Sequence, residues 1–309
     1  MNKDLSNLRE KLQALLLAQH DSSPRGNVAD YIPALAEVDP NLMGAAIATI
    51  DGDFVGVGDY QHAFSIQSIS KVFGLVMAMN RVGDSLWQRV NMEPSGQPFN
   101  SIIQLEWEKG IPRNPVINAG AILISDVLVS HYSASKLAFV SFLRTIANDE
   151  DIHIDHDVFQ SELTHGNRNA ALAYLMKSFN NIEAEVPDVL EHYFTQCSVT
   201  MNCQQLAQSL LFLANKGINP LTNTPVCTRK EAHRVNAILS TSGMYDQSGE
   251  FAFSVGLPAK SGVGGGIVAI VPNFGVICAW SPPLNSFGNS VVGMNFIAGL
   301  AEELGLSIY

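Results

Sequence analysis

A serine and a lysine stand three residues apart in the segment Phe64-Ser65-Ile66-Gln67-Ser68-Ile69-Ser70-Lys71. Residues i and i+3 of a helix share a face, so this spacing predicts that Ser68 and Lys71 stand side by side. A serine at a helix N-terminus lies beside free backbone N–H groups and the positive end of the helix dipole, which favour a developing oxyanion. A lysine one turn further on can accept the hydroxyl proton if burial or a second cation lowers its pKa. The pattern is typical of Ser-x-x-Lys acyl-transfer enzymes.

The same spacing occurs a second time, at Ser133 and Lys136. A bare Ser-x-x-Lys also fits a helix N-cap serine followed by a solvated lysine, so the surroundings must separate the two copies. Ser68 opens the apolar run 72–79, which must be buried and should draw Lys71 in with it. Ser133 lies between two helical runs. We therefore expect chemistry at Ser68 and a capping role at Ser133.

A glycine-rich segment near the C-terminus, 258–266, contains Lys260-Ser261-Gly262 directly before an apolar strand. A Lys-Ser-Gly on an edge strand accompanies Ser-x-x-Lys in the penicillin-recognising enzymes. Lys260 would supply a second cation that lowers the pKa of Lys71, and the glycines would let backbone N–H groups approach a substrate. Alone, the segment also fits a hairpin turn with one solvated lysine. The order and setting of the two motifs together favour an enzyme.

The elements that must position these motifs alternate along the chain between strand and helix patterns. Strands are predicted near both ends, at 43–50, 54–58, 251–255, 266–271 and 275–280, the first two joined by a hairpin at 51–53. Helices are predicted at the N-terminus from Leu5 onward, over 28–38, 118–130, 134–148, 168–178, 188–194 and 204–215, and finally over 290–304. Proline and glycine punctuate 83–115, which indicates loops and short helices that line a cleft.

This order predicts an α+β fold whose antiparallel sheet is built from both chain ends, with flanking helices and an inserted helical region. We interpret residues 1–309 as one catalytic domain. Its sheet part would cover about 1–66 and 230–309, and its helical part about 67–229. The alternating acidic and histidine residues of 151–157 could suggest a metal site, but an exposed extended edge is favoured, and no metal site is expected.

Composition excludes several classes of function. The chain has 309 residues, 47% of them hydrophobic and only 15% charged, which indicates a packed globule. A net charge of −11 argues against binding to nucleic acid or an anionic membrane.

The four cysteines (Cys197, Cys203, Cys227 and Cys278) show no C-x-x-C spacing and indicate a reduced compartment. Neither a signal peptide nor a membrane span is recognisable, so a cytoplasmic location is expected.

Five segments together resemble the serine-dependent glutaminases. They are Gln67-Ser68-Ile69-Ser70-Lys71, Glu93-Pro94-Ser95-Gly96, Asn114-Pro115-Val116-Ile117-Asn118-Ala119-Gly120-Ala121, Ser242-Gly243-Met244-Tyr245 and Leu257-Pro258-Ala259-Lys260-Ser261-Gly262-Val263. The resemblance runs from about Val28 to the C-terminus, and the compact length is similar to that of the bacterial members. It implies a β-lactamase/transpeptidase-like fold, hydrolysis of L-glutamine to L-glutamate and ammonia, no cofactor, and a homo-oligomer, either dimer or tetramer.

The resemblance also implies which residues carry the chemistry. Ser68 would be the nucleophile and Lys71 its activating base. The backbone N–H groups of Ser68 and Val263 would form the oxyanion hole. Tyr31 and Tyr245 match family tyrosines beside the nucleophile, and either could relay protons.

The resemblance further implies a clamp for the two charged groups on the α-carbon of glutamine. Glu162 would pair with the α-ammonium, while Asn118, Asn169, Tyr193 and Tyr245 would hold the polar ends of the substrate. The clamp makes chemical sense on its own terms, because a buried site built for those groups rejects analogues that lack them.

Two alternatives stay open on the sequence. A β-lactamase or a peptidoglycan D,D-peptidase uses the same motifs, but these enzymes need export and no signal sequence is seen. A non-catalytic metabolite-binding or scaffold protein could retain the fold. The intact set Ser68, Lys71 and Lys260 argues against that second alternative.

Overall fold

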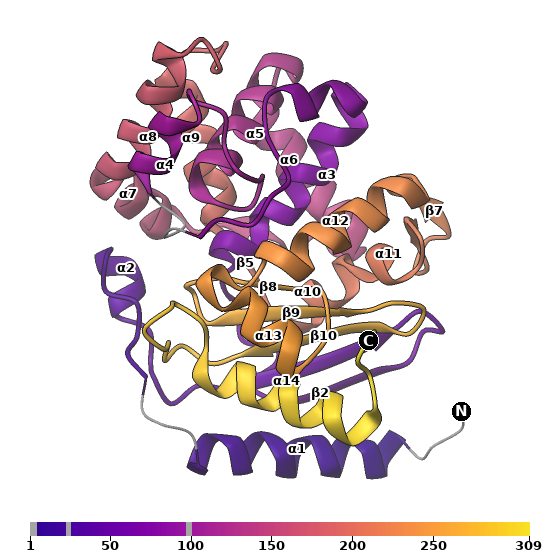
Figure 1. Cartoon of the computed structure of the whole chain (residues 1–309). Coiled ribbons are helices and arrows are strands. Elements are labelled where there is room, and N and C mark those ends of the chain that lie inside the picture. The colour runs from indigo at the N-terminus through magenta and orange to yellow at the C-terminus, as the bar shows by residue number, and fades with distance from the viewer. Residues whose placement is uncertain (1–4, 23–25, 97–100) are drawn as a thin grey trace.

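A five-stranded antiparallel sheet forms the centre of one half of the molecule (Figure 1). The computed structural model describes residues 5–22, 26–96 and 101–309. The strand order is β2-β1-β10-β9-β8. The strands are β1 (Gly44–Thr49), β2 (Phe54–Gly58), β8 (Ala259–Ser261), β9 (Gly266–Val271) and β10 (Gly275–Trp280). Because β1 pairs with β10 from Gly44↔Trp280 to Thr49↔Gly275, the two ends of the chain meet inside the sheet, which confirms the predicted α+β architecture.

Both faces of the sheet are buried, which explains why its strands are apolar throughout. Side chains alternate between the faces. On β1, Ala45 and Ile47 join a core with helices α1 (Leu5–Ser22) and α14 (Val291–Leu304), whereas Ala46 and Ala48 join the larger core of the helical region. The predicted N-terminal and C-terminal helices are therefore confirmed, and together they cover one face of the sheet (Figure 1).

Three helices fill the centre of the helical region, where α5 packs against both α3 and α9. They are α3 (Ser70–Val82), α5 (Asn118–His131) and α9 (Val186–Cys197). Buried apolar residues run along all three, so hardly any of their surface reaches solvent. A polar side chain placed on these helices is held away from water.

The remaining elements surround these two cores. The helices are α2 (Pro33–Ala36), α4 (Ile102–Trp107), α6 (Ser135–Ala147), α7 (His156–His165), α8 (Asn167–Ser178), α10 (Cys203–Ser209), α11 (Leu211–Ala214), α12 (Arg229–Ser242) and α13 (Ser248–Ser254), with 3-10 turns η1 (Gln67–Ile69), η2 (Gly83–Gln88) and η3 (Tyr245–Gln247). Two small sheets join β3 (Phe64–Ser65), β5 (Val199–Met201) and β4 (His153–Ile154), and β6 (Ile218–Asn219) with β7 (Thr224–Pro225). Within the part of the chain that the structure describes, no helix is long and apolar enough to cross a membrane.

The predicted strand at 251–255 is wrong, because residues 251–254 belong to helix α13 and Val255 is its C-cap residue. Phe251 is buried, Phe253 is 95% exposed and Val255 is buried again. A strand would place all three residues on one face, whereas helical spacing separates Phe253 from the other two. Three aromatic and β-branched residues in alternation thus imitated a strand.

Other boundaries differ in smaller ways. The helix expected over 28–38 is reduced to the four residues of α2, and the one expected over 204–215 divides at Leu210 into α10 and α11. The extended edge expected at 151–157 is only the two-residue strand β4, after which Asp155 caps α7 through the N–H groups of Asp157 and Val158. No cluster of metal-ligand side chains occurs among the described residues.

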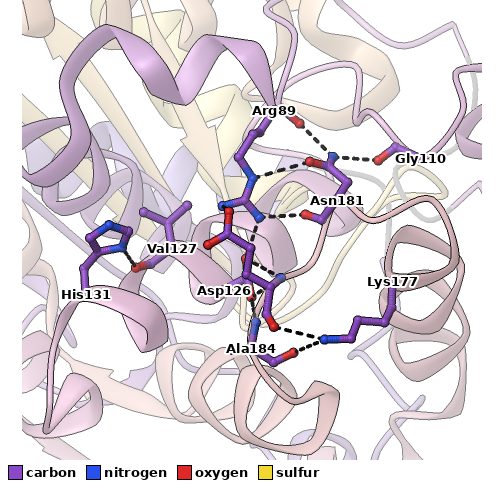
Figure 2. Close-up of polar contacts among 9 residues, drawn as sticks. Arg89, Gly110, Asp126, Val127, His131, Lys177, Asn181 and Ala184 are labelled. Carbon is purple, nitrogen blue, oxygen red and sulfur yellow. Dashed lines mark hydrogen bonds and ion pairs between the residues drawn. The ribbon is translucent and has the colours of Figure 1, made fainter.

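A buried ion pair between Arg89 and Asp126 is the centre of a hydrogen-bond network that joins three parts of the helical region (Figure 2). Asp126, fully buried on α5, accepts hydrogen bonds from the Arg89 guanidinium at 2.5 Å and from the backbone N–H of Ala184 at 2.8 Å. Arg89 follows η2, and Ala184 lies between α8 and α9. Asn181 extends the link, since its side-chain amide donates to the carbonyls of Arg89 and Gly110. The network fixes α5 relative to the connection between α8 and α9.

Candidate active site

Ser68 lies in the 3-10 turn η1, directly before α3, as expected for a serine at a helix entrance. The preceding residue, Gln67, has a φ of +47°, which turns the chain from β3 into the helix. A non-glycine residue in this left-handed region is strained, and such strain is found at functional sites. The backbone N–H of Ile66 bonds to the Val199 carbonyl at 2.9 Å, which anchors the turn. The Ser68 side chain is 8% exposed.

The glycine-rich segment lies against the backbone of this turn. A Cβ on Gly262 would come within 2.6 Å of the Ile66 carbonyl oxygen, and one on Gly264 within 2.2 Å of the Ser65 carbonyl oxygen. The two motifs are thus adjacent in space, although about 190 residues separate them in sequence. These glycines allow the segment to pack on the nucleophile turn, which brings Val263 beside Ser68.

Lys71 is buried in the core of the helical region. Its side chain is 1% exposed, and its Nζ donates to the Oδ1 of Asn118 at 2.7 Å. The Nδ2 of Asn118 donates in turn to the Oδ1 of Asn169 at 3.0 Å, so a chain of contacts runs from α3 through α5 to α8. Burial lowers the pKa of Lys71 to about 8, while the nearby Cys197 and Glu162 oppose that shift. Lys71 therefore becomes an uncharged base as the pH rises through about 8, well below the range in which an ordinary lysine loses its proton.

Lys260 is fully buried on β8. Its Nζ donates to the carbonyls of Gly243 at 3.2 Å and Ser261 at 2.6 Å, and lies 4.6 Å from the centre of the Tyr245 ring. Burial, followed by repulsion from Lys71, lowers the pKa of Lys260 well below its usual value. Two close ammonium groups in the core each disfavour the charge of the other. The largest cause of the lowered pKa of Lys71 is its own burial.

Tyr245 lies on the other side of the nucleophile. Its ring is buried, and burial raises the pKa of its phenol, although hydrogen bonding with the Ser68 hydroxyl and the Val263 backbone opposes that shift. The phenol therefore stays protonated beside the serine. Lys260, Tyr245 and Val263, all from the C-terminal third of the chain, converge on the turn that carries Ser68.

Glu162 and Tyr31 form the opposite wall. The Tyr31 hydroxyl donates to Glu162 Oε1 at 2.7 Å and to Gln67 Oε1 at 3.2 Å. Glu162 is 3% exposed, and burial raises the pKa of its carboxyl, whereas bonds from Tyr31 and Gln67 and the charge of Lys71 lower it. A carboxylate that has lost water but has no direct ion pair with a described residue is well suited to receive a substrate cation. The Tyr31 ring itself is 51% exposed, so only its hydroxyl end reaches inward.

Two residues that sequence reasoning did not assign lie in this site. Gln67 contacts both Tyr31 and Glu162 and precedes Ser68. Cys197 is buried, hydrogen-bonds with Tyr193, and influences the pKa of Lys71. Helical spacing could have found Cys197, because it lies four residues after Tyr193 on α9. No sequence signal marks the strained backbone of Gln67.

The second Ser-x-x-Lys copy lies outside this site. Ser133 is exposed, and Lys136 pairs with Glu191 on the surface at 2.5 Å. Lys71 is therefore buried and Lys136 is partly solvated, as predicted for each.

A model of the glutaminase family matches residues 26–309. The chain belongs to the glutaminase family. Glutaminases from Rhizobium rhizogenes and Aliarcobacter butzleri are 53% and 49% identical to it, covering 96% and 99% of this chain and 98% of each relative. The predicted family and enzyme class are confirmed, and the β-lactamase and D,D-peptidase alternatives are set aside.

Solved structures agree with the sequence comparison. A probable glutaminase from Bacillus subtilis superposes with a TM-score of 0.91 at 34% identity, covering 99% of both chains. A glutaminase from the same organism, in covalent complex with 5-oxo-L-norleucine after reaction with 6-diazo-5-oxo-L-norleucine, superposes with a TM-score of 0.88 at 32% identity, covering 97% of this chain and 99% of that one. The β-lactamase-like fold implied by the resemblance is confirmed.

The pKa values of the two buried lysines predict the pH dependence of activity. If neutral Lys71 is the base, kcat/KM should rise about tenfold per pH unit below its pKa of about 8 and level off above it. Because burial and repulsion from Lys71 lower the pKa of Lys260 well below its usual value, we expect Lys260 to be neutral while Lys71 titrates, so that Lys260→Met lowers activity without moving that rise. Ammonia release measured from pH 5.5 to 9.5 on both enzymes checks this. An upward shift of about one pH unit in a folded Lys260→Met enzyme would show that Lys260 carries a charge that acts on Lys71.

Proposed function

We propose that the glutamine hydrolysis of this family proceeds in this chain through a γ-glutamyl ester on Ser68. The observation that carries the proposal is the buried Lys71 amine with its pKa lowered to about 8, one helical turn from a serine in a strained, enclosed turn. A buried amine of low pKa is what a serine nucleophile needs beside it. The covalent analogue complex of the Bacillus subtilis relative supports a reactive nucleophile in the equivalent fold.

In the first half-reaction, neutral Lys71 takes the proton of the Ser68 hydroxyl as the serine oxygen attacks the side-chain amide carbon of glutamine. The carbonyl oxygen becomes an oxyanion, which the backbone N–H groups of Ser68 and Val263 stabilise. When the tetrahedral intermediate collapses, the carbon–nitrogen bond breaks. The leaving nitrogen receives a proton from Lys71, directly or through the Tyr245 or Tyr31 phenol, and departs as ammonia.

In the second half-reaction, water attacks the ester carbon and gives its proton to Lys71. The ester bond breaks, the proton returns to Ser68, and L-glutamate leaves. The net reaction converts glutamine and water into glutamate and ammonia, and none of these steps uses a cofactor or a metal. Lys260 takes part as a neutral amine that supports the Tyr245 ring, and not as a second cation.

The substrate clamp rests on Glu162. Its buried carboxylate would bind the α-ammonium, with Asn118 and Asn169 as neighbouring amide groups and Tyr193 and Tyr245 as phenol donors. The Asn118–Asn169 bond supports this grouping, because it holds α5 and α8 together beside Lys71. Free glutamine carries opposite charges on one carbon, so a site with one carboxylate and several neutral donors suits it.

We further propose that residues 1–309 act as one catalytic domain, with the sheet part and helical part given above, and that the protein works in the cytoplasm as a homo-oligomer, dimer or tetramer. The four cysteines are all buried and free, which fits a reduced compartment. Large apolar side chains on the outside of α4, Ile103 (62% exposed) and Trp107 (76% exposed), would be covered in an oligomer.

Ser68→Ala should reduce ammonia release from glutamine to background while leaving the thermal unfolding midpoint close to that of wild type. The hydroxyl makes the bond to substrate, and its loss removes no large packing group. Ser133→Ala is the matched control and should keep wild-type kcat. Ammonia release by folded Ser68→Ala at more than about a hundredth of the wild-type rate contradicts the assignment.

Glu162→Gln should reduce kcat/KM for glutamine by about a hundredfold to several thousandfold. The change keeps the shape and removes the charge, and leaving a buried ammonium unpaired costs about 3–5 kcal/mol. The loss should be much smaller on the analogue of glutamine that lacks the α-amino group, because there wild type has no cation to satisfy. Comparing both enzymes on both substrates isolates the pair. Equal losses on the two substrates would mean that Glu162 does not bind the ammonium.

A further inference from the structure

Tyr245 has a backbone conformation that a tyrosine side chain disfavours. Its φ is +52°, in the left-handed region, which disfavours a bulky side chain. Strain of this kind persists only where surrounding contacts fix the backbone. The phenol interacts with the Ser68 hydroxyl from this strained position. The contacts that hold the backbone of the Tyr245 turn therefore determine whether this interaction forms.

A group of amide side chains, Gln247, Asn285 and Asn289, lies behind the turn and is called here the amide cluster. The Oε1 of Gln247 accepts one bond from Asn285 Nδ2 at 2.7 Å and another from Asn289 Nδ2 at 2.8 Å. Asn289 Nδ2 also donates to the carbonyl of Met244, the residue before Tyr245, at 3.2 Å. Asn289 is fully buried and Gln247 is 8% exposed. Buried hydrogen bonds of this kind are costly to break, because they leave unpaired polar groups.

The amide cluster also shapes the loop that packs on the Tyr245 ring. Asn285 Oδ1 accepts from the backbone N–H of Asn289 at 3.1 Å, and the Gly288 N–H donates to the Asn285 carbonyl at 3.0 Å. Gly288 has a φ of +90°, and a Cβ there would lie 3.6 Å from the Tyr245 ring and 3.7 Å from the Val263 side chain. The loop therefore lies against both residues that adjoin Ser68 from the C-terminal part of the chain.

We propose that Gln247 is a positioning residue of the reaction. As the single acceptor shared by Asn285 and Asn289, it joins the 285–289 loop to the turn of Tyr245 and keeps the phenol at the Ser68 hydroxyl. The inference rests on the proposed function, specifically on the part taken by Tyr245. Gln247 acts only through Tyr245, so its removal should affect the chemical step more than substrate binding.

The first test is Gln247→Met, which keeps the length of the side chain and removes the shared acceptor. Displacing a reacting group by about 1 Å can reduce rate about a hundredfold, so kcat for glutamine should fall about 10- to 100-fold. KM should change by less than kcat does, because in the proposed clamp only the Tyr245 phenol is displaced, while Glu162 and Asn169 would still bind the substrate from α7 and α8. Thermal unfolding checks that each variant is folded. If Gln247→Met does not fold, Asn285→Ala tests the same link at a less buried position.

A rescue experiment separates positioning from general support of the fold. Gln247 Nε2 donates to Glu250 Oε2 at 3.0 Å, and Glu250 is exposed. The double substitution Gln247→Glu with Glu250→Gln exchanges the two groups and keeps an acceptor oxygen for Asn285 and Asn289. It should restore kcat to within about threefold of wild type. Glu250→Gln alone is the control and should be as active as wild type.

A double-mutant cycle with Tyr245→Phe decides the matter. Removing the phenol should lower kcat by about a hundredfold or more, as expected for a positioned proton donor. Adding Gln247→Met to Tyr245→Phe should then lower kcat by less than about threefold, since the group to be positioned is gone. A full additive loss, or a folded exchange variant that stays inactive, overturns the role of Gln247 alone. Wild-type kcat in Tyr245→Phe overturns the part assigned to Tyr245 and the inference with it.

Discussion

The rest of the structure depends on keeping the amine of one lysine inside a protein core. Lys71 lies among apolar side chains of α3, α5 and α9, where a charged ammonium is poorly solvated. The molecule meets this constraint without a direct ion pair to Lys71 among the described residues. Asn118 accepts one hydrogen bond, Glu162 acts from further away, and the pKa falls to about 8. The amine therefore loses its proton at a pH well below that of an ordinary lysine, and its neutral form is the one a serine nucleophile requires.

The same constraint explains the arrangement of the neighbouring charges. Glu162 is close enough to favour the charged form of Lys71, yet its direct hydrogen bonds come from the neutral groups of Tyr31 and Gln67. A carboxylate bonded directly to Lys71 would hold the lysine proton and leave no charge for a substrate cation. Lys260 also lies in the core. Its pKa is lowered well below the usual value, and its amine donates hydrogen bonds to two backbone carbonyls. In the proposed clamp, the α-ammonium of the substrate would therefore pair with Glu162, and neutral donors would hold the substrate carboxylate.

Sequence reasoning predicted the parts of the fold that local pattern or motif decides. The hairpin of β1 and β2 and the burial of Lys71 but not Lys136 follow from apolar runs and turn residues. It failed where local pattern imitates another structure, as with Phe251 and Phe253 on α13 and Val255 at its C-cap. It also could not reveal relations between distant segments, such as the bonds from Asn285 and Asn289 to Gln247, or the strained backbone of Gln67 and Tyr245. Tertiary contacts alone impose those features.

The most direct measurement is the mass and location of the covalent adduct after treatment with 6-diazo-5-oxo-L-norleucine, the reagent that reacts with the Bacillus subtilis relative. Intact-protein mass spectrometry of wild type should show one added 5-oxo-norleucine group per chain, and peptide mapping should place it on Ser68. Ser68→Ala should remain unmodified under the same conditions, while Ser133→Ala should be modified fully. An adduct on any residue other than Ser68, or an equal yield in Ser68→Ala, would contradict the account in which Lys71 is buried to activate that serine.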